Sequence, residues 1–152
     1  MELNEQNYQE IIQSYPKTKW QPLLDLISGI ESQTKFGEIA GGNNDENNIM
    51  QMPYWEESPL VLEFRKVISE LPIIVNFDWS NWKEGRIMMT DKNFDFDSVS
   101  IPIKCKLITA IIRSDRFSEG ALVASFGSGL ILKILKSIQK QLNWVTKTGY
   151  VK

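Results

Sequence analysis

The densest cluster of polar side chains in an otherwise apolar stretch is Arg113-Ser114-Asp115-Arg116-Phe117-Ser118-Glu119-Gly120. Its arginines could bind a phosphate or a carboxylate, and its acids could bind hydroxyl groups or transfer a proton. The same residues could instead hold a corner between two helices through acid–arginine hydrogen bonds. Structural ion pairs are commoner than functional ones, so we favour the corner. The candidate ligand-binding residues in this cluster are Arg113, Asp115, Arg116 and Glu119.

Asp115 carries the most specific expectation of this cluster. The spacing places it in the last turn of a helix, where the exposed carbonyl groups disfavour an anion. An unpaired acid would therefore destabilise the helix end. We predict that Arg116 or Arg113 holds the Asp115 carboxylate and thereby fixes the corner between the two C-terminal helices.

A second candidate site follows the segment Phe77-Asp78-Trp79-Ser80-Asn81-Trp82. Asp78, Trp79 and Trp82 could line the same pocket as the arginines and stack a planar ligand. Two tryptophans one helical turn apart are more often part of a core, with one polar edge satisfied. The core interpretation is favoured, and the three residues remain ligand-binding candidates.

Several kinds of catalytic and metal site are excluded by composition. The chain has no histidine, which removes the usual serine and cysteine triads and histidine-ligated zinc. Cys105 is the only cysteine, so it cannot form an intramolecular disulfide. The acidic run at 91–97 resembles the start of a calcium loop, but Phe96 stands where the loop requires glycine and Pro102 where it requires glutamate. The sequence indicates neither a metal nor a cofactor.

Net charge argues against partners that carry a strong negative field. Seventeen Lys and Arg against 19 Asp and Glu leave a net charge of -2, which argues against nucleic acid and an anionic membrane. The lysines at 133, 136 and 140 are expected to form a solvated helix face. The longest uncharged run, 120–132, is too short to span a bilayer. We expect a cytoplasmic protein whose partner is another protein or a small anionic ligand, and homo-oligomerisation stays open.

The elements that must position these residues are mostly helical. Two short alternating runs, 35–39 and 49–55, flank a Gly/Asn/Asp-rich tip and predict a β-hairpin. Leu107, Ile111, Leu130, Ile134 and Ile138 should be buried together between the last two helices. The pattern predicts an α+β fold: one predominantly α-helical domain spanning 1–152 with a small antiparallel β-hairpin. The expected helices cover about 4–15, 20–28, 59–71, 78–89, 102–116, 119–126 and 128–142.

Three separate blocks of the chain resemble a bacterial domain family of unknown function. They are the hairpin with Phe36-Gly37-Glu38 and Met52-Pro53-Tyr54, the segment from Phe77 to Trp82 ("FDW..W"), and 107–135 with its "R.DRF.EG.L" signature. The resemblance covers most of residues 35–140 and implies an α+β fold in one domain. It implies no activity, ligand or catalytic residue.

Two functions from different classes are therefore carried forward. A non-enzymatic binding or protein-interaction module is favoured, because no familiar catalytic constellation is available without histidine. The alternative is an enzyme, or a binder of a small anionic ligand, at the corner formed by residues 113–119. In the enzyme, Asp115 and Glu119 would be the reactive acids, and Arg113 or Arg116 would steady an anion.

Overall fold

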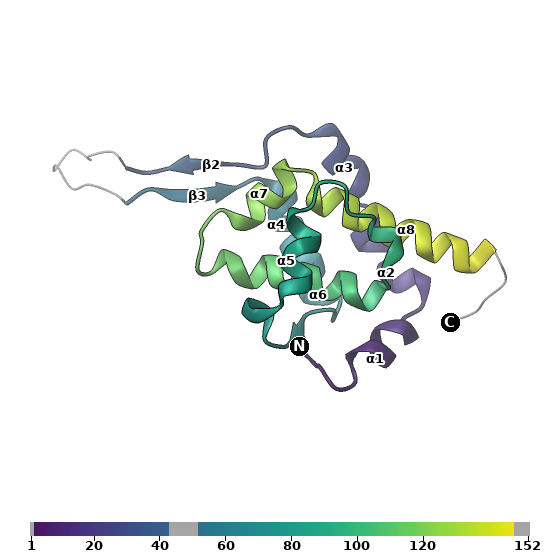
Figure 1. The fold of residues 1–152 in the computed structure, drawn as a ribbon. Helices are drawn as coiled ribbons and strands as arrows, with labels where there is room; N and C mark the ends of the chain where they lie inside the picture. The colour runs from purple at the N-terminus through teal and green to yellow at the C-terminus, as the bar shows by residue number, and fades with distance from the viewer. Residues whose placement is uncertain (1, 43–51, 148–152) are drawn as a thin grey trace.

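Helices dominate the molecule, as Figure 1 shows. The computed structural model describes residues 2–42 and 52–147, with side chains up to residue 143. More than half of the chain is helical, and the predicted α+β class with one small antiparallel hairpin is confirmed. The α-helices are α1 (Tyr8–Ser14), α2 (Lys17–Leu24), α3 (Ile27–Ser32), α4 (Pro59–Glu70), α5 (Lys83–Thr90), α6 (Ile101–Asp115), α7 (Ala121–Gly127) and α8 (Leu130–Lys147).

The antiparallel hairpin consists of β2 (Gly37–Ala40) and β3 (Tyr54–Glu57), with Gly37 opposite Glu57 and Ala40 opposite Tyr54. It extends away from the helical body in Figure 1. The second strand begins later than predicted, after Pro53, whose nitrogen has no hydrogen to donate to a ladder. Residues 43–51, which include the polar tip and the start of the predicted second strand, lie outside the described residues.

A second pair of strands was not predicted. β1 (Leu3–Asn4) runs parallel to β4 (Val75–Asn76), with Leu3 opposite Val75. The amide of Leu3 donates to the carbonyl of Ile74 at 2.7 Å. This pairing replaces the predicted start of the first helix at Asn4, and it brings Glu2 close to the end of α6.

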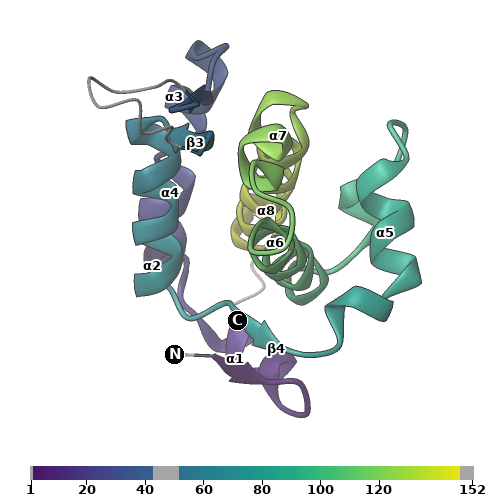
Figure 2. The ribbon, with the colours of Figure 1, turned by 90° about the vertical axis from the view of Figure 1, so that its left-hand side faces the viewer.

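Three groups of helices share one core. In Figure 2, α6, α7 and α8 stand in the middle, with α2 and α4 on one side and α5 on the other. The predicted contact between the last two long helices is confirmed for Leu107, Ile111, Ile134 and Ile138, which are all buried. Leu130, the first residue of α8, is only partly buried. The Phe126 ring joins this core to α4, with its centroid 5.1 Å from that of Phe64.

Local capping sets where the helices around the site begin. The Ser58 hydroxyl accepts from the amide of Val61 at the start of α4, and Pro59 follows it as predicted. The Ser100 hydroxyl does the same at the start of α6. The segment predicted as one helix over 20–28 is instead split into α2 and α3.

Two 3-10 turns complete the described chain, at Trp79–Asn81 (η1) and Phe96–Ser98 (η2). Among the described residues, no single helix is both long and apolar enough to cross a membrane. Helices α7 and α8 meet that criterion of length and composition only as a pair, and they are bent by 67° at the break between them.

Candidate functional site

The Asp115 carboxylate links the end of α6 to α4 and α7, but not through the predicted arginines. One of its oxygens lies 3.0 Å from Arg65 Nη2 on α4, and the other accepts from the amide of Leu122 at 3.0 Å. The prediction that Arg113 or Arg116 holds Asp115 is therefore wrong. The adverse carbonyl dipoles at the end of α6 are offset by a cation from α4 and by the exposed N–H groups at the start of α7.

Arg65 is the centre of this structural network. Its guanidinium donates to both oxygens of Glu57, from Nε at 2.7 Å and from Nη2 at 2.6 Å. The hydrogen bond with Glu57 raises the pKa of Arg65, and the contact with Asp115 adds to the effect. Such paired, charge-assisted bonds fix geometry as well as charge. Arg65 therefore joins the end of the hairpin, α4 and the end of α6.

Glu119 also has a structural contact. Its carboxylate accepts a hydrogen bond from the backbone amide of Trp55 on β3. The Trp55 side chain lies directly over Gly120, the residue before α7. Asp115 and Glu119 thus hold the hairpin and α7 in place, and neither residue lines the pocket described next.

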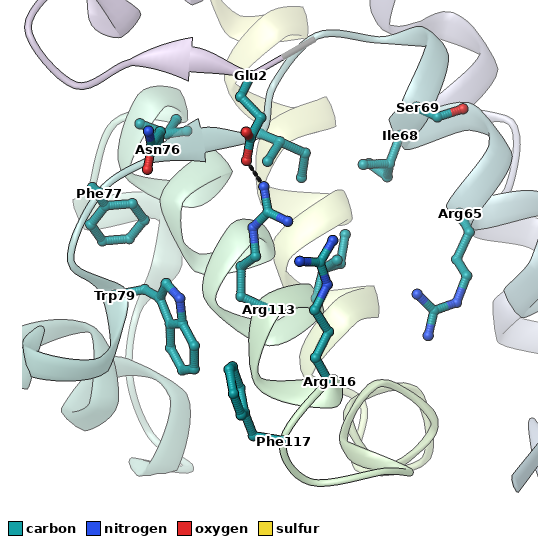
Figure 3. A pocket seen from close by; sticks show the side chains of 13 residues that line it. Glu2, Arg65, Ile68, Ser69, Asn76, Phe77, Trp79, Arg113, Arg116 and Phe117 are labelled. Atoms are coloured by element: carbon teal, nitrogen blue, oxygen red, sulfur yellow. Dashed lines mark ion pairs between the residues drawn. The ribbon is translucent and has the colours of Figure 1, made fainter.

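The two arginines of the cluster face a different space. A pocket of about 720 Å³, here called the arginine pocket, lies between the end of α6, β4, η1 and α4. Figure 3 shows Arg113 and Arg116 extending into it from α6 and the turn that follows. Its volume is within the usual range for small-molecule sites. The lining residues are Glu2, Arg65, Ile68, Ser69, Ile74, Val75, Asn76, Phe77, Trp79, Ile112, Arg113, Arg116 and Phe117.

Positive charges outnumber negative charges among the side chains that line the arginine pocket. Arg113 forms an ion pair with Glu2, drawn as the dashed line in Figure 3. No ion pair or hydrogen bond holds the Arg116 guanidinium within the described part of the chain. Burial lowers the pKa of Arg113, and the nearby charge of Arg116 lowers it further. Three arginines line the pocket, and Arg65 is paired with Glu57 and Asp115. The charges of Arg113 and Arg116 repel each other, and a bound anion would relieve that repulsion.

Aromatic rings form the opposite wall. The Trp79 and Phe117 rings have centroids 6.0 Å apart and planes inclined by 33°. Trp79 lies on η1, and Asp78 holds this turn. The Asp78 carboxylate accepts from the Ser80 hydroxyl at 3.1 Å and from the side-chain amide of Asn81 at 2.8 Å. These hydrogen bonds lower the pKa of Asp78. Asp78 therefore positions Trp79, and it does not line the arginine pocket.

Trp82 points to another part of the molecule. Its ring meets Phe77 edge to face, with the centroids 5.4 Å apart, and it packs closely on Gly85 of α5. The ammonium group of Lys106 lies over both rings, 4.5 Å from the Phe77 centroid and 5.8 Å from that of Trp82. Trp79 and Trp82 therefore do not share a site. The helix expected to carry both is interrupted, because η1 ends before α5 begins at Lys83.

Pocket residues that sequence reasoning missed come from distant segments. Glu2 and Asn76 reach the arginine pocket through the unpredicted β1–β4 pair, and Arg65 reaches it from α4. Phe117 belongs to the polar cluster 113–120 in the sequence, but the sequence gives no sign that its side chain is exposed. Groups of three or more acidic or cysteine residues able to hold a metal ion do not occur in the described part of the chain.

The contacts of Asp115 predict a stability effect. We expect Asp115→Asn to lower the free energy of unfolding by about 1–3 kcal/mol, because it leaves the partly buried Arg65 short of one anion. Arg116 is the next residue and forms no ion pair with the described residues, so Arg116→Ala should change the free energy of unfolding by less than about 0.5 kcal/mol. Urea unfolding of both variants measures the difference. An Asp115→Asn variant as stable as the wild type would contradict the structural role.

The comparisons with known proteins agree with the resemblance noted in the sequence. A family model described as a family of unknown function (DUF6508) matches residues 15–144. The match includes the whole α6–α7 corner and every residue lining the arginine pocket except Glu2. No match was found among curated proteins or among solved structures.

Proposed function

We propose that this chain, which belongs to the DUF6508 family of unknown function, is a binding module that takes a small anionic ligand in the arginine pocket. The observation that carries the proposal is the Arg116 guanidinium, which faces a pocket of about 720 Å³ beside Arg113 and has no acidic partner among the described residues. Arginine retains its charge at every physiological pH and binds carboxylates and phosphates through paired hydrogen bonds.

A binding role is favoured over the enzymatic alternative by the positions of the acids. Asp115 is engaged by Arg65 and by the amide of Leu122, and Glu119 by the amide of Trp55. Neither acid lines the arginine pocket, so neither is placed to transfer a proton to a ligand held there. The one lining carboxylate is that of Glu2, which is paired with Arg113.

We place this module in the bacterial cytoplasm, with a small anionic metabolite rather than nucleic acid as its partner. The resemblance to a bacterial family supports the bacterial origin. The single cysteine, Cys105, supports a reducing compartment, although its burial makes it unreactive: burial raises its pKa well above the usual value. The net charge of -2 supports the exclusion of nucleic acid.

Anion binding should depend on Arg116. We expect Arg116→Gln to weaken binding of inorganic phosphate at low ionic strength by about tenfold, the usual effect of losing one charge-assisted hydrogen bond. The measurement is a titration followed by the ¹H–¹⁵N signals of the tryptophan indoles, since Trp79 lines the pocket. Lys133→Gln removes one positive charge from an exposed position on α8 outside the pocket, and it should leave the affinity nearly unchanged.

The same titration of Glu2→Gln should show the opposite effect, a higher affinity for phosphate. The Glu2 carboxylate occupies Arg113, so removing its charge should free this arginine and strengthen phosphate binding several-fold. Arg116→Gln without effect, or equal losses in Arg116→Gln and Lys133→Gln, would show general charge attraction and would contradict a site in this pocket. A wild-type protein that binds no small anion would contradict the function itself.

A further inference from the structure

An exposed aromatic ring, that of Phe117, lies at the edge of the arginine pocket. Phe117 lines the pocket and is 83% exposed, although it follows directly on Arg116 in the turn between α6 and α7. The amide of Phe117 donates to the carbonyl of Ser114 at 3.0 Å, which holds the backbone of this turn. Among the described residues, Trp79 is the one aromatic side chain that contacts this ring. An exposed aromatic ring that lines a pocket is available to contact a ligand bound there.

The relative orientation of the two rings suits a flat ligand. Their planes are inclined by 33°, closer to parallel than to the perpendicular arrangement of Phe77 and Trp82, which meet at 84°. Figure 3 shows Trp79 and Phe117 extending toward each other on the side of the pocket away from Arg65. A planar ring laid against them would gain stacking contacts that an aliphatic group of the same size cannot make.

An acidic side chain of the protein itself indicates which anionic group Arg113 accepts. The Glu2 carboxylate forms an ion pair with Arg113 inside the pocket, so this arginine is positioned to receive a carboxylate. Arg116 stands beside it with its charge unmatched among the described residues. A ligand carboxylate placed between the two arginines would take over the role of Glu2 and neutralise the second charge as well.

We propose that the ligand of the arginine pocket is a planar aromatic carboxylate. Arg113 and Arg116 bind its carboxylate, and Trp79 and Phe117 cover its ring. This inference rests on the proposed function and makes it more specific, because a binder of small anions in general would not distinguish an aromatic from a saturated ligand. The pocket has room for such a molecule, at about 720 Å³.

The test compares 2-naphthoate with its saturated analogue, decahydro-2-naphthoate, which has the same carboxylate and a non-planar, non-aromatic ring system. Both dissociation constants are measured by titration against the full chain. We expect 2-naphthoate to bind about three- to tenfold more tightly, the range that aromatic contacts supply. In Phe117→Leu this preference should become smaller, because Trp79 alone then covers the ring. In Arg116→Gln both naphthoates should weaken by the same factor.

Phe117→Leu is a clean variant because the ring is exposed, and its thermal midpoint should match that of the wild type. Leu62→Ala, at an exposed apolar position on α4 outside the pocket, is the matched control and should retain the full preference. Equal affinities of the wild type for the two ligands, or a preference that is undiminished in Phe117→Leu, would overturn the aromatic inference and leave anion binding standing. Failure of phosphate, acetate and both naphthoates to bind would overturn the proposed function and this inference with it.

Discussion

Gly120→Ala should lower the free energy of unfolding by about 2–5 kcal/mol, through two independent effects. Gly120 has a φ of +94°, a backbone conformation that residues with a Cβ atom rarely adopt. A Cβ atom at this position would also lie 2.2 Å from Nε1 of Trp55, so the indole would have to move. Because Trp55 belongs to β3, the change should loosen the hairpin as well as the start of α7. Urea unfolding gives the size of the loss.

Two other glycines of the same region separate the two effects. Gly129 has a φ of +87° with open space around its Cβ position, so Gly129→Ala tests backbone strain alone and should cost about 1–2 kcal/mol. Gly127 lies in α7 with an ordinary φ and open space, so Gly127→Ala should be neutral or slightly stabilising. If Gly120→Ala lowers the free energy of unfolding by no more than Gly129→Ala does, the close approach of Trp55 to Gly120 does not contribute to the loss.

Lys104→Met should raise the free energy of unfolding by about 2 kcal/mol at pH 7. Lys104 is fully buried on α6, and its ammonium nitrogen has no hydrogen-bond partner in the described part of the chain. Burial lowers its pKa to about 8, although the charges of Asp97 and Asp95 act in the opposite direction. Methionine has a similar length and no charge, so it can fill the same space without that cost.

The pH dependence of this effect has a definite sign. The pKa of Lys104 is about 8 in the folded protein, against 10.5 for an ordinary lysine. Between these values the unfolded chain binds more protons, so the stability of the wild type rises with pH over this window. The advantage of Lys104→Met should be fully present below pH 8 and should shrink toward pH 10.5. Chemical denaturation of both proteins at pH 7 and pH 10 measures this change.

Lys106→Met is the matched control on the same helix and should have the opposite sign. Its ammonium group lies 2.8 Å from Glu5 and 4.5 Å from the centroid of the Phe77 ring, so its charge is well accommodated. A Lys106→Met variant should lose stability. If Lys104→Met lowers the free energy of unfolding as much as Lys106→Met does, the ammonium group of Lys104 stabilises the fold, contrary to the cost of burial inferred from its lack of a partner.

Local features of the sequence determined most of the helices. The spacing of Leu107 and Ile111, and of Ile134 and Ile138, defines one apolar stripe on each of two helices, and these stripes pack as predicted. Ser58 followed by Pro59 marks the start of α4, because a capping hydroxyl and a fixed φ act within a single turn. Each of these signals depends only on residues within about one helical turn, so it can be read before the fold is known.

The composition also determined which chemistries are absent. Without histidine, and with a single buried cysteine, the chain has no imidazole and no pair of thiols anywhere along its length. The cluster around Arg113 and Arg116 was recognised for the same reason, since charged residues stand out in an apolar stretch. Its position in the sequence identified the region that contains the arginine pocket.

Only the tertiary structure decided which charged residues of that cluster form structural ion pairs and which face the arginine pocket. Asp115 pairs with Arg65, 50 residues away, rather than with its neighbours in the sequence. Arg113 pairs with Glu2, which a two-residue parallel strand brings into place. Strands this short have no periodicity to detect, and the direction in which each arginine points depends on how α4 and η1 pack against α6. Sequence spacing fixes which residues share a helix, but the partner of each charge is set by helix packing over long distances in the chain.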